Sequence, residues 1–247
     1  MNPLLQQLEM TMKINNLKYS FLFAFIIGLG IIKAQNNNDF RAWSSFEIGG
    51  NLTKKFSLSL KTQARFYNQL TQLNGVYYSL DASRKIKNKW SIESGLRFNT
   101  SNTWNSFRMR IGLSKKFKLN KIEFSIRGLY QVQLNEFGFQ ENYRNIPISS
   151  ARIKIQAERK LKKHLKLKIY TEPLWRKEFG DVYLRRIRNS IGLEYALNKN
   201  LSAEISYLYQ PQFSPRRAVN IINLSLSFDL PRKKKKGKDK SEVPQLK

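Results

Sequence analysis

Hydrophobic and polar residues alternate one by one through most of the chain after residue 36. The clearest example is FSLSLKTQARFY at residues 56–67, where apolar or small residues hold the even positions and polar or charged residues the odd ones. Successive side chains of a β-strand point to opposite faces. This stretch therefore predicts a strand with one apolar face and one polar face.

The same alternation predicts eleven strand segments, at residues 40–52, 56–67, 76–86, 90–98, 106–113, 122–134, 153–161, 165–171, 183–195, 201–209 and 221–230. Short turns alternate with longer connections, of which residues 135–150 are the longest. Outer-membrane barrels have short periplasmic turns and longer external loops, and tilted strands of about ten residues cross a bilayer. The pattern predicts an all-β fold over residues 35–230: a single antiparallel transmembrane β-barrel of about 10–12 strands with meander topology.

An odd number of segments conflicts with the even number of strands in bacterial single-chain barrels. Ten strands result if residues 40–52 do not span the membrane. Twelve strands result if the alternation fails to reveal one strand. We favour twelve.

The polar faces of the predicted strands carry charges of both signs. A soluble secreted β-sandwich, the alternative fold, also alternates, but it packs its apolar face inward. In a membrane barrel the apolar face contacts lipid, and opposite charges can pair in the lumen. The candidate lumen-lining residues are Lys61, Arg65, Glu93, Arg97, Arg108, Arg110, Glu123, Arg127, Glu158, Glu194 and Glu204.

Tyrosine and tryptophan residues gather near predicted strand ends on the side of the longer connections. Amphipathic rings suit the depth of lipid headgroups, so we expect an aromatic girdle there. Its candidate members are Tyr67, Tyr77, Tyr78, Trp104, Trp175, Tyr183 and Tyr209.

Four polar residues fall on the predicted lipid face. Asn189 lies mid-strand, and a β-bulge would move it. Arg84, Arg159 and Arg185 lie near strand ends. An arginine costs about 0–1 kcal/mol there, against ~2–4 kcal/mol at the midplane.

Residues 1–34 have the features of a secretory signal peptide. Lys13 and Lys18 precede the apolar run YSFLFAFIIGLGII at residues 19–32, and Ala34 offers a small residue for cleavage. The run is shorter than the about 20 apolar residues of a spanning helix, although an uncleaved anchor is the alternative. Residues 1–11 look like an extension upstream of a start at Met10 or Met12. We expect cleavage after Ala34 and delivery to a Gram-negative outer membrane.

The chain is strongly basic, with 45 Lys and Arg residues against 17 Asp and Glu residues and a formal net charge of +28. Such a balance suits nucleic acid or anionic lipid. Because a signal peptide removes the chain from cytoplasmic nucleic acid, we expect outer-membrane lipid and lipopolysaccharide as partners, no nucleic acid, and a monomer. Residues 231–247, PRKKKKGKDKSEVPQLK, predict a basic disordered tail.

No motif predicts catalysis, a metal site or a cofactor. Phosphate-binding glycine loops, paired-histidine motifs and GxSxG are absent, and there is no cysteine. The single histidine, His164, lies in a predicted turn, where we expect a solvated side chain. Four carboxylates could serve as acids or bases only if unpaired, and we expect arginines to pair with them: Asp81, Glu93, Glu123 and Glu204.

Several motifs are similar to those of a known barrel family. They are Trp43, the strand from Lys55-Phe56-Ser57-Leu58 to Arg65-Phe66, Arg108-Met109-Arg110-Ile111-Gly112, Glu172-Pro173 and Arg188-Asn189-Ser190-Ile191-Gly192-Leu193-Glu194-Tyr195. In these residues the chain resembles the uncharacterised outer-membrane β-barrel family catalogued as domain of unknown function 2490, over residues 39–230. The resemblance implies a barrel in the outer membrane, no assigned activity and no catalytic residues.

These observations predict a non-enzymatic outer-membrane barrel, either structural or a narrow channel for small solutes. Arginines in an open lumen would favour anions. Arg65 either lines the solute path or neutralises Glu47 or Glu93. The alternatives are a lipid-modifying barrel enzyme that uses His164, and a soluble secreted β-sandwich that binds an acidic ligand.

Overall fold

The structure is a computed structural model that describes residues 38–101, 105–136, 147–178 and 180–231. The predicted signal peptide, its upstream extension, Trp104 and the tail from residue 232 lie outside these residues. Among the described residues, no helix has the length and apolarity to cross a membrane.

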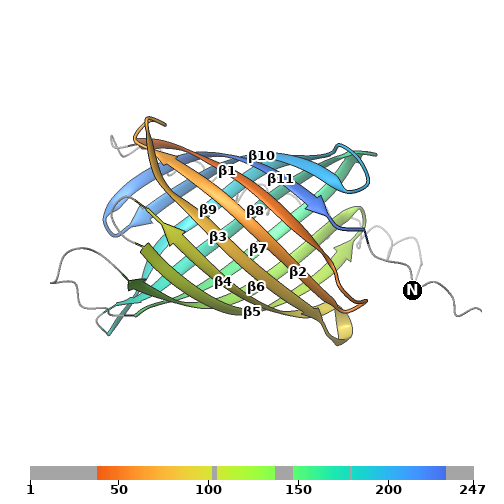
Figure 1. The fold of residues 1–247 in the computed structure, drawn as a ribbon, viewed down its shortest axis with the longest axis horizontal. Coiled ribbons are helices and arrows are strands. Elements are labelled where there is room, and N and C mark those ends of the chain that lie inside the picture. Colours follow the sequence, from red (N-terminus) through yellow and green to blue (C-terminus); the bar gives the residue numbers. More distant parts are fainter. Residues whose placement is uncertain (1–37, 102–104, 137–146, 179, 232–247) are drawn as a thin grey trace, which may run out of the picture. The chain divides into compact units, whose positions relative to one another are not determined.

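Eleven strands form a closed barrel in which each strand pairs antiparallel with the next along the chain (Figure 1). They are β1 (Asn38–Asn51), β2 (Phe56–Tyr67), β3 (Gln72–Lys85), β4 (Trp90–Thr100), β5 (Asn105–Leu119), β6 (Ile122–Glu136), β7 (Ile148–Lys162), β8 (Leu165–Glu178), β9 (Asp181–Ala196), β10 (Leu201–Phe213) and β11 (Arg216–Asp229). A short 3-10 helix, η2 (Lys87–Lys89), precedes β4. The predicted all-β barrel with meander order is confirmed.

The favoured count of twelve strands is wrong, because the barrel closes with an odd number. β1 and β11 are neighbours. Since each successive strand reverses direction, the first and the eleventh run the same way, and the seam between them is parallel. At this seam the N–H of Leu230 donates to the carbonyl oxygen of Gly49 at 2.7 Å.

The predicted alternation of short and long connections is largely wrong, because several strands are longer than the pattern indicated. The described strands leave one connection longer than four residues, between Glu136 and Ile148. We call the end of the barrel with the β1–β2 and β3–β4 connections the turn end. The opposite end, where residues 137–147 connect β6 to β7, is the loop end.

Pro173 illustrates why the predicted loops were too long. It lies inside β8, opposite Ile187 of β9, although the sequence placed it in a loop. A proline has no N–H to donate to a strand ladder. The pairing of β7 with β8 is accordingly interrupted between the Arg152–Leu174 and Ile155–Thr171 pairs, and it resumes beyond in the same register.

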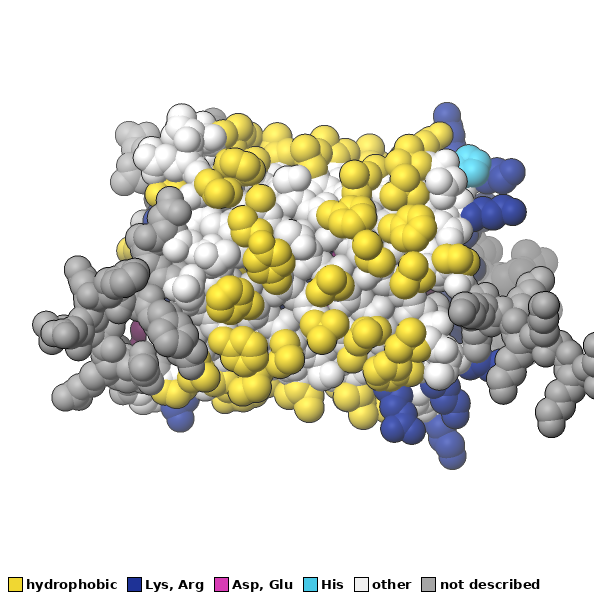
Figure 2. All heavy atoms as spheres, viewed as in Figure 1, with side chains coloured by type: hydrophobic (Ala, Val, Ile, Leu, Met, Phe, Trp, Pro, Cys, Tyr) yellow, Lys and Arg dark blue, Asp and Glu magenta, His cyan; other side chains and the backbone are white. Residues whose placement is uncertain are grey.

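Apolar side chains cover the outside of the barrel wall (Figure 2). Leu60 is 56% exposed, Ile111 58% and Ile205 54%. A water-soluble protein rarely exposes a continuous apolar surface of this kind, whereas a closed barrel in lipid requires one. The alternative of a β-sandwich with an apolar interior is therefore excluded.

Asn189 keeps its predicted position on the outward-facing side of β9. The hydroxyl of Thr171 on β8 donates to its side-chain oxygen at 2.9 Å. The pair satisfies a polar group on an otherwise apolar surface, so no β-bulge is needed at this position.

Candidate functional site: the interior of the barrel

Contacts between strands that are not neighbours show which side chains fill the interior. Arg127 of β6 lies 3.7 Å from Glu93 of β4, with β5 between them. Arg188 of β9 stacks on Trp43 of β1 with 5.5 Å to the ring centroid. Side chains on the outside of a convex wall cannot make such contacts, so these residues meet across the lumen.

A cluster of six arginines occupies the interior: Arg65, Arg97, Arg108, Arg152, Arg186 and Arg188. We call this set the arginine cluster. Its members come from β2, β4, β5, β7 and β9. Two of them, Arg97 and Arg108, are direct cross-strand partners. Like charges placed opposite one another on adjacent strands are destabilising, so the cluster needs compensation.

Glu172 of β8 is the one carboxylate that contacts the arginine cluster among the described residues. Its side chain is 4% exposed and lies 3.3 Å from Arg152 and 3.1 Å from Arg188. A third arginine, Arg127, lies 3.4 Å away. One buried carboxylate is thus paired with three guanidinium groups, so the arginine cluster carries a large net positive charge.

Aromatic rings stabilise the cluster where carboxylates are absent. Arg65 lies between Trp43 and Tyr77, with its guanidinium carbon 4.2 Å and 3.9 Å from the two ring centroids. Its Nε and Nη2 atoms donate to the side-chain oxygen of Gln63 at 2.9 and 2.7 Å. Cation–π contacts of this kind contribute about 2 kcal/mol or more when desolvated. Arg65 therefore neutralises neither Glu47 nor Glu93.

Apolar side chains narrow the lumen beside β10 and β11. Leu208, Val219 and Ile221 are almost completely buried and pack together, with Trp43 and Tyr170 against them. Their strands place them on the inward face, since outward-facing neighbours such as Leu224 are exposed. The lumen is therefore narrower at this level.

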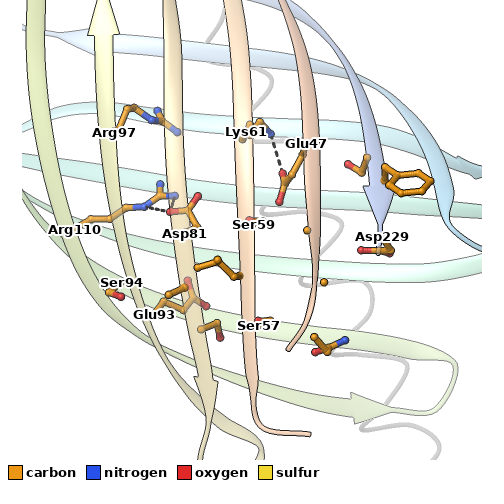
Figure 3. A pocket seen from close by; sticks show the side chains of 18 of the residues that line it. Glu47, Ser57, Ser59, Lys61, Asp81, Glu93, Ser94, Arg97, Arg110 and Asp229 are labelled. Carbon is orange, nitrogen blue, oxygen red and sulfur yellow. Dashed lines mark hydrogen bonds and ion pairs between the residues drawn. The ribbon is translucent and has the colours of Figure 1, made fainter. Parts of the chain in front are cut away.

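Towards the turn end the interior widens into a chamber of about 460 Å³ (Figure 3). Three ion pairs cross its wall. Lys61 lies 3.5 Å from Glu47, Arg127 lies 3.7 Å from Glu93, and Arg110 Nε donates to Asp81 at 3.0 Å. In a separate part of the interior, lined by β7 to β10, the Lys168 ammonium pairs with Glu194 and, at 2.7 Å, with Glu204.

The structure places the predicted lumen residues as follows. Chamber-lining residues are Lys61, Glu93, Arg97, Arg110 and Arg127. Arg65 and Arg108 belong to the arginine cluster, Glu194 and Glu204 pair with Lys168, and Glu158 accepts a hydrogen bond from Gln156. Glu123 lies near the β5–β6 turn, where its side chain is 47% exposed beside Lys116. Whether any of these residues lines a solute path stays a prediction.

The predicted aromatic girdle is wrong for Tyr77. That residue lies inside, between the guanidinium groups of Arg65 and Arg97, because its position in β3 has inward parity. Tyr78 is outward and 47% exposed. Partly buried residues at or near the loop end are Tyr67, Trp175, Tyr183 and Tyr209.

The sequence missed several interior residues: Trp43, Arg152, Tyr170, Glu172, Arg186 and Arg188. Glu172 was missed because the proline that follows it suggested a loop. Arg152 was missed because residues up to 150 were assigned to the longest connection. Extending the alternation of β7 and β8 through these breaks would have found both residues.

The groups that could support catalysis are paired or solvated. Ion pairs engage all four candidate carboxylates: arginines pair with Asp81 and Glu93, as predicted, whereas lysines pair with Glu123 and Glu204. His164 is exposed in the β7–β8 turn, 6.3 Å from the ring of Tyr195. In the described part of the chain, no three His, Asp or Glu side chains gather as metal ligands.

The model of a protein family described as "Protein of unknown function (DUF2490)" matches residues 40–220. The chain belongs to this family. The resemblance seen in the sequence is thereby confirmed. No curated protein matches this DUF2490 chain.

A solved porin shares the fold of this DUF2490 protein. The NanC porin superposes with a TM-score of 0.52 and 13% identity, covering 78% of this chain and 99% of NanC. The KdgM porin gives a TM-score of 0.44 with 14% identity over 70% of this chain and 89% of its own. A KdgM porin in complex with disordered oligogalacturonate gives 0.44 and 13%, with coverages of 70% and 90%. The fold is that of a porin-like outer-membrane β-barrel.

Proposed function

We propose that this protein is a narrow outer-membrane channel that favours small anions. The arginine cluster carries the proposal: six guanidinium groups lie in the interior, and among the described residues a single carboxylate, Glu172, contacts two of them, Arg152 and Arg188. Rings of cationic side chains are the usual means by which pores select anions. The apolar group of Leu208, Val219 and Ile221, together with Trp43, would set the narrowest point.

The outer surface of the barrel supports a position in the membrane. Its apolar side chains would contact lipid, and the turn end would face the periplasm. Exposed lysines surround that end (Figure 2), including Lys54, Lys87, Lys89, Lys118 and Lys163. We expect them to contact anionic lipid headgroups, at about 1 kcal/mol per residue. The protein is expected to act as a monomer.

Conductance in planar bilayers tests the channel. In a potassium chloride gradient we expect a small current whose reversal potential lies near the chloride equilibrium potential. Exchanging Arg108→Gln and Arg186→Gln together should move the reversal potential towards zero, because it removes two uncompensated charges. Arg216→Gln, at an exposed position of the loop end, is the matched control and should leave the potential unchanged.

A reversal potential near that of potassium would contradict anion selectivity. A complete absence of current would remove the channel and leave a structural barrel. A lipid-modifying enzyme has less support, since His164 is exposed in a turn and the candidate acids are engaged in ion pairs.

A further inference from the structure

The chamber near the turn end has the dimensions of a ligand site. Its volume of about 460 Å³ falls within the ~300–1,000 Å³ typical of small-molecule pockets. Its wall comes from β1 to β6 and from β11. Figure 3 shows Arg97 and Arg110 on one side and Asp229 on the other.

Most charges in the chamber wall already have partners. The three carboxylates Glu47, Asp81 and Glu93 each pair with one cation of the wall. The fourth carboxylate, Asp229, is exposed at the end of β11, where water and salt screen it. The wall therefore offers little uncompensated negative charge to a ligand.

Arg97 differs from the other cations of the chamber. Its Nε donates to the hydroxyl of Ser79 at 2.8 Å, and its guanidinium lies 5.9 Å from the Tyr77 ring. Among the described residues it has no carboxylate partner. The positive charges of Arg65, Arg110, Arg108 and Arg152 also act on it. The inner end of the chamber is therefore positive, and a buried cation without a counter-charge is costly.

The rest of the wall is rich in hydroxyl groups. The serines that line it with inward side chains are Ser57, Ser59, Ser83 and Ser227. Hydroxyls both donate and accept hydrogen bonds, so they suit a polar solute. A guanidinium can hold a carboxylate or phosphate through two parallel hydrogen bonds.

We propose that the chamber is a binding site for a small oxyanion, a carboxylate or a phosphate, held at its inner end by Arg97. This site rests on the proposed function, because an anion that crosses the barrel would bind there on its way through the lumen. Binding at equilibrium and current can nevertheless be measured separately.

Titration calorimetry on the purified full chain in detergent tests the site, with inorganic phosphate and gluconate as probes. Sorbitol is the control for gluconate, since it has the hydroxyls without the carboxylate. We expect saturable binding of at least one anion and none of sorbitol. The two anions distinguish a phosphate site from a carboxylate site.

Three variants locate the site. Arg97→Gln should weaken binding at least tenfold, which corresponds to about 1.4 kcal/mol. Asp81→Asn should strengthen it several-fold, because it releases Arg110 in the same wall. Arg216→Gln, the same exchange at an exposed position of the loop end, should have no effect. The different migration of boiled and unboiled samples on a gel confirms that each variant is folded, and Asp81→Asn keeps the test valid if Arg97→Gln does not fold.

Several results would overturn the site: no saturable anion binding, binding of sorbitol as strong as that of gluconate, or unchanged affinity in both Arg97→Gln and Asp81→Asn. Binding without current would leave the site and remove the channel. Current without binding would leave the channel and remove the site.

Discussion

At the scale of single residues, the interior combines three ways of holding an arginine. Arg110 has a carboxylate partner in Asp81, Arg188 shares Glu172 with two other arginines, and Arg65 has two aromatic rings. These arrangements differ in charge balance. Only the first neutralises its arginine fully.

Glu172 should be the most important carboxylate for stability. Glu172→Gln leaves the buried guanidinium groups of Arg152 and Arg188 without a counter-charge. Breaking a buried pair in this way costs about 3–5 kcal/mol. Glu123→Gln is the control, because its exposed pair with Lys116 is worth about 0–1 kcal/mol. Urea unfolding in lipid vesicles measures both, and equal losses would contradict the assigned role of Glu172.

The ion pair between Asp81 and Arg110 passes over Gly95 and should require a glycine at this position. Gly95 lies between Asp81 and Arg110 on one rung of the sheet, and an added Cβ would collide with both side chains, at 2.6 Å from Arg110 Nε. Gly95→Ala should lower the free energy of unfolding by about 1–3 kcal/mol. Gly128→Ala, where a Cβ meets open space, should be neutral. If urea midpoints fell equally for both variants, the close approach at Gly95 would not be the cause.

At the scale of elements, alternation alone specifies which face of a strand meets lipid. The opening pattern of β2 holds in the structure, since Leu58 and Leu60 are outward and exposed while Gln63 is buried. The same rule placed Asn189 correctly. The rule also agrees with the inward position of Tyr77, and the girdle prediction failed there because it set the parity of the strand aside.

A charge on the lipid face of β2 should destabilise the protein by an amount that depends on its depth in the membrane. Leu60→Arg places a guanidinium well inside the apolar band and should cost about 2–4 kcal/mol. Leu52→Arg, in the exposed β1–β2 turn, should cost about 0–1 kcal/mol. Folding equilibria in vesicles compare the two variants. Similar costs at both positions would argue against lipid contact at Leu60.

The sequence was sufficient to predict which face of each strand points inward, but not where the strands end or how many there are. Face assignment needs only a local period of two residues. Strand ends depend on pairing with neighbours, as at Pro173, where β8 continues because β9 pairs with it on the other side. The arginine cluster depends on contacts between strands far apart in sequence. Parity can therefore predict that Arg65 and Arg108 face inward but not that they meet.

At the scale of the whole molecule, the parallel seam is the least expected feature. An antiparallel meander with an even number of strands closes antiparallel, whereas eleven strands must close with β1 and β11 running together. An ideal Cβ on Gly50 would lie 3.0 Å from the Cβ of Leu230, which shows how closely the two strands approach.

A cross-link tests the seam directly, because the chain has no cysteine of its own. Gly50→Cys combined with Leu230→Cys should form a disulfide on oxidation after a small outward shift to the usual Cβ separation of about 3.8 Å. Non-reducing gels and mass spectrometry would detect the closed loop. The two single variants are the controls. If the pair remained reduced in folded protein, another strand or a gap would separate β1 from β11.

The central claim is that the apolar faces of this barrel meet lipid while its charges lie inside. The most direct measurement is membrane fractionation followed by a gel of boiled and unboiled protein. We expect the protein to stay in the membrane pellet through a high-salt wash and to migrate differently before and after boiling. Release by salt, together with identical migration of the two samples, would contradict the claim.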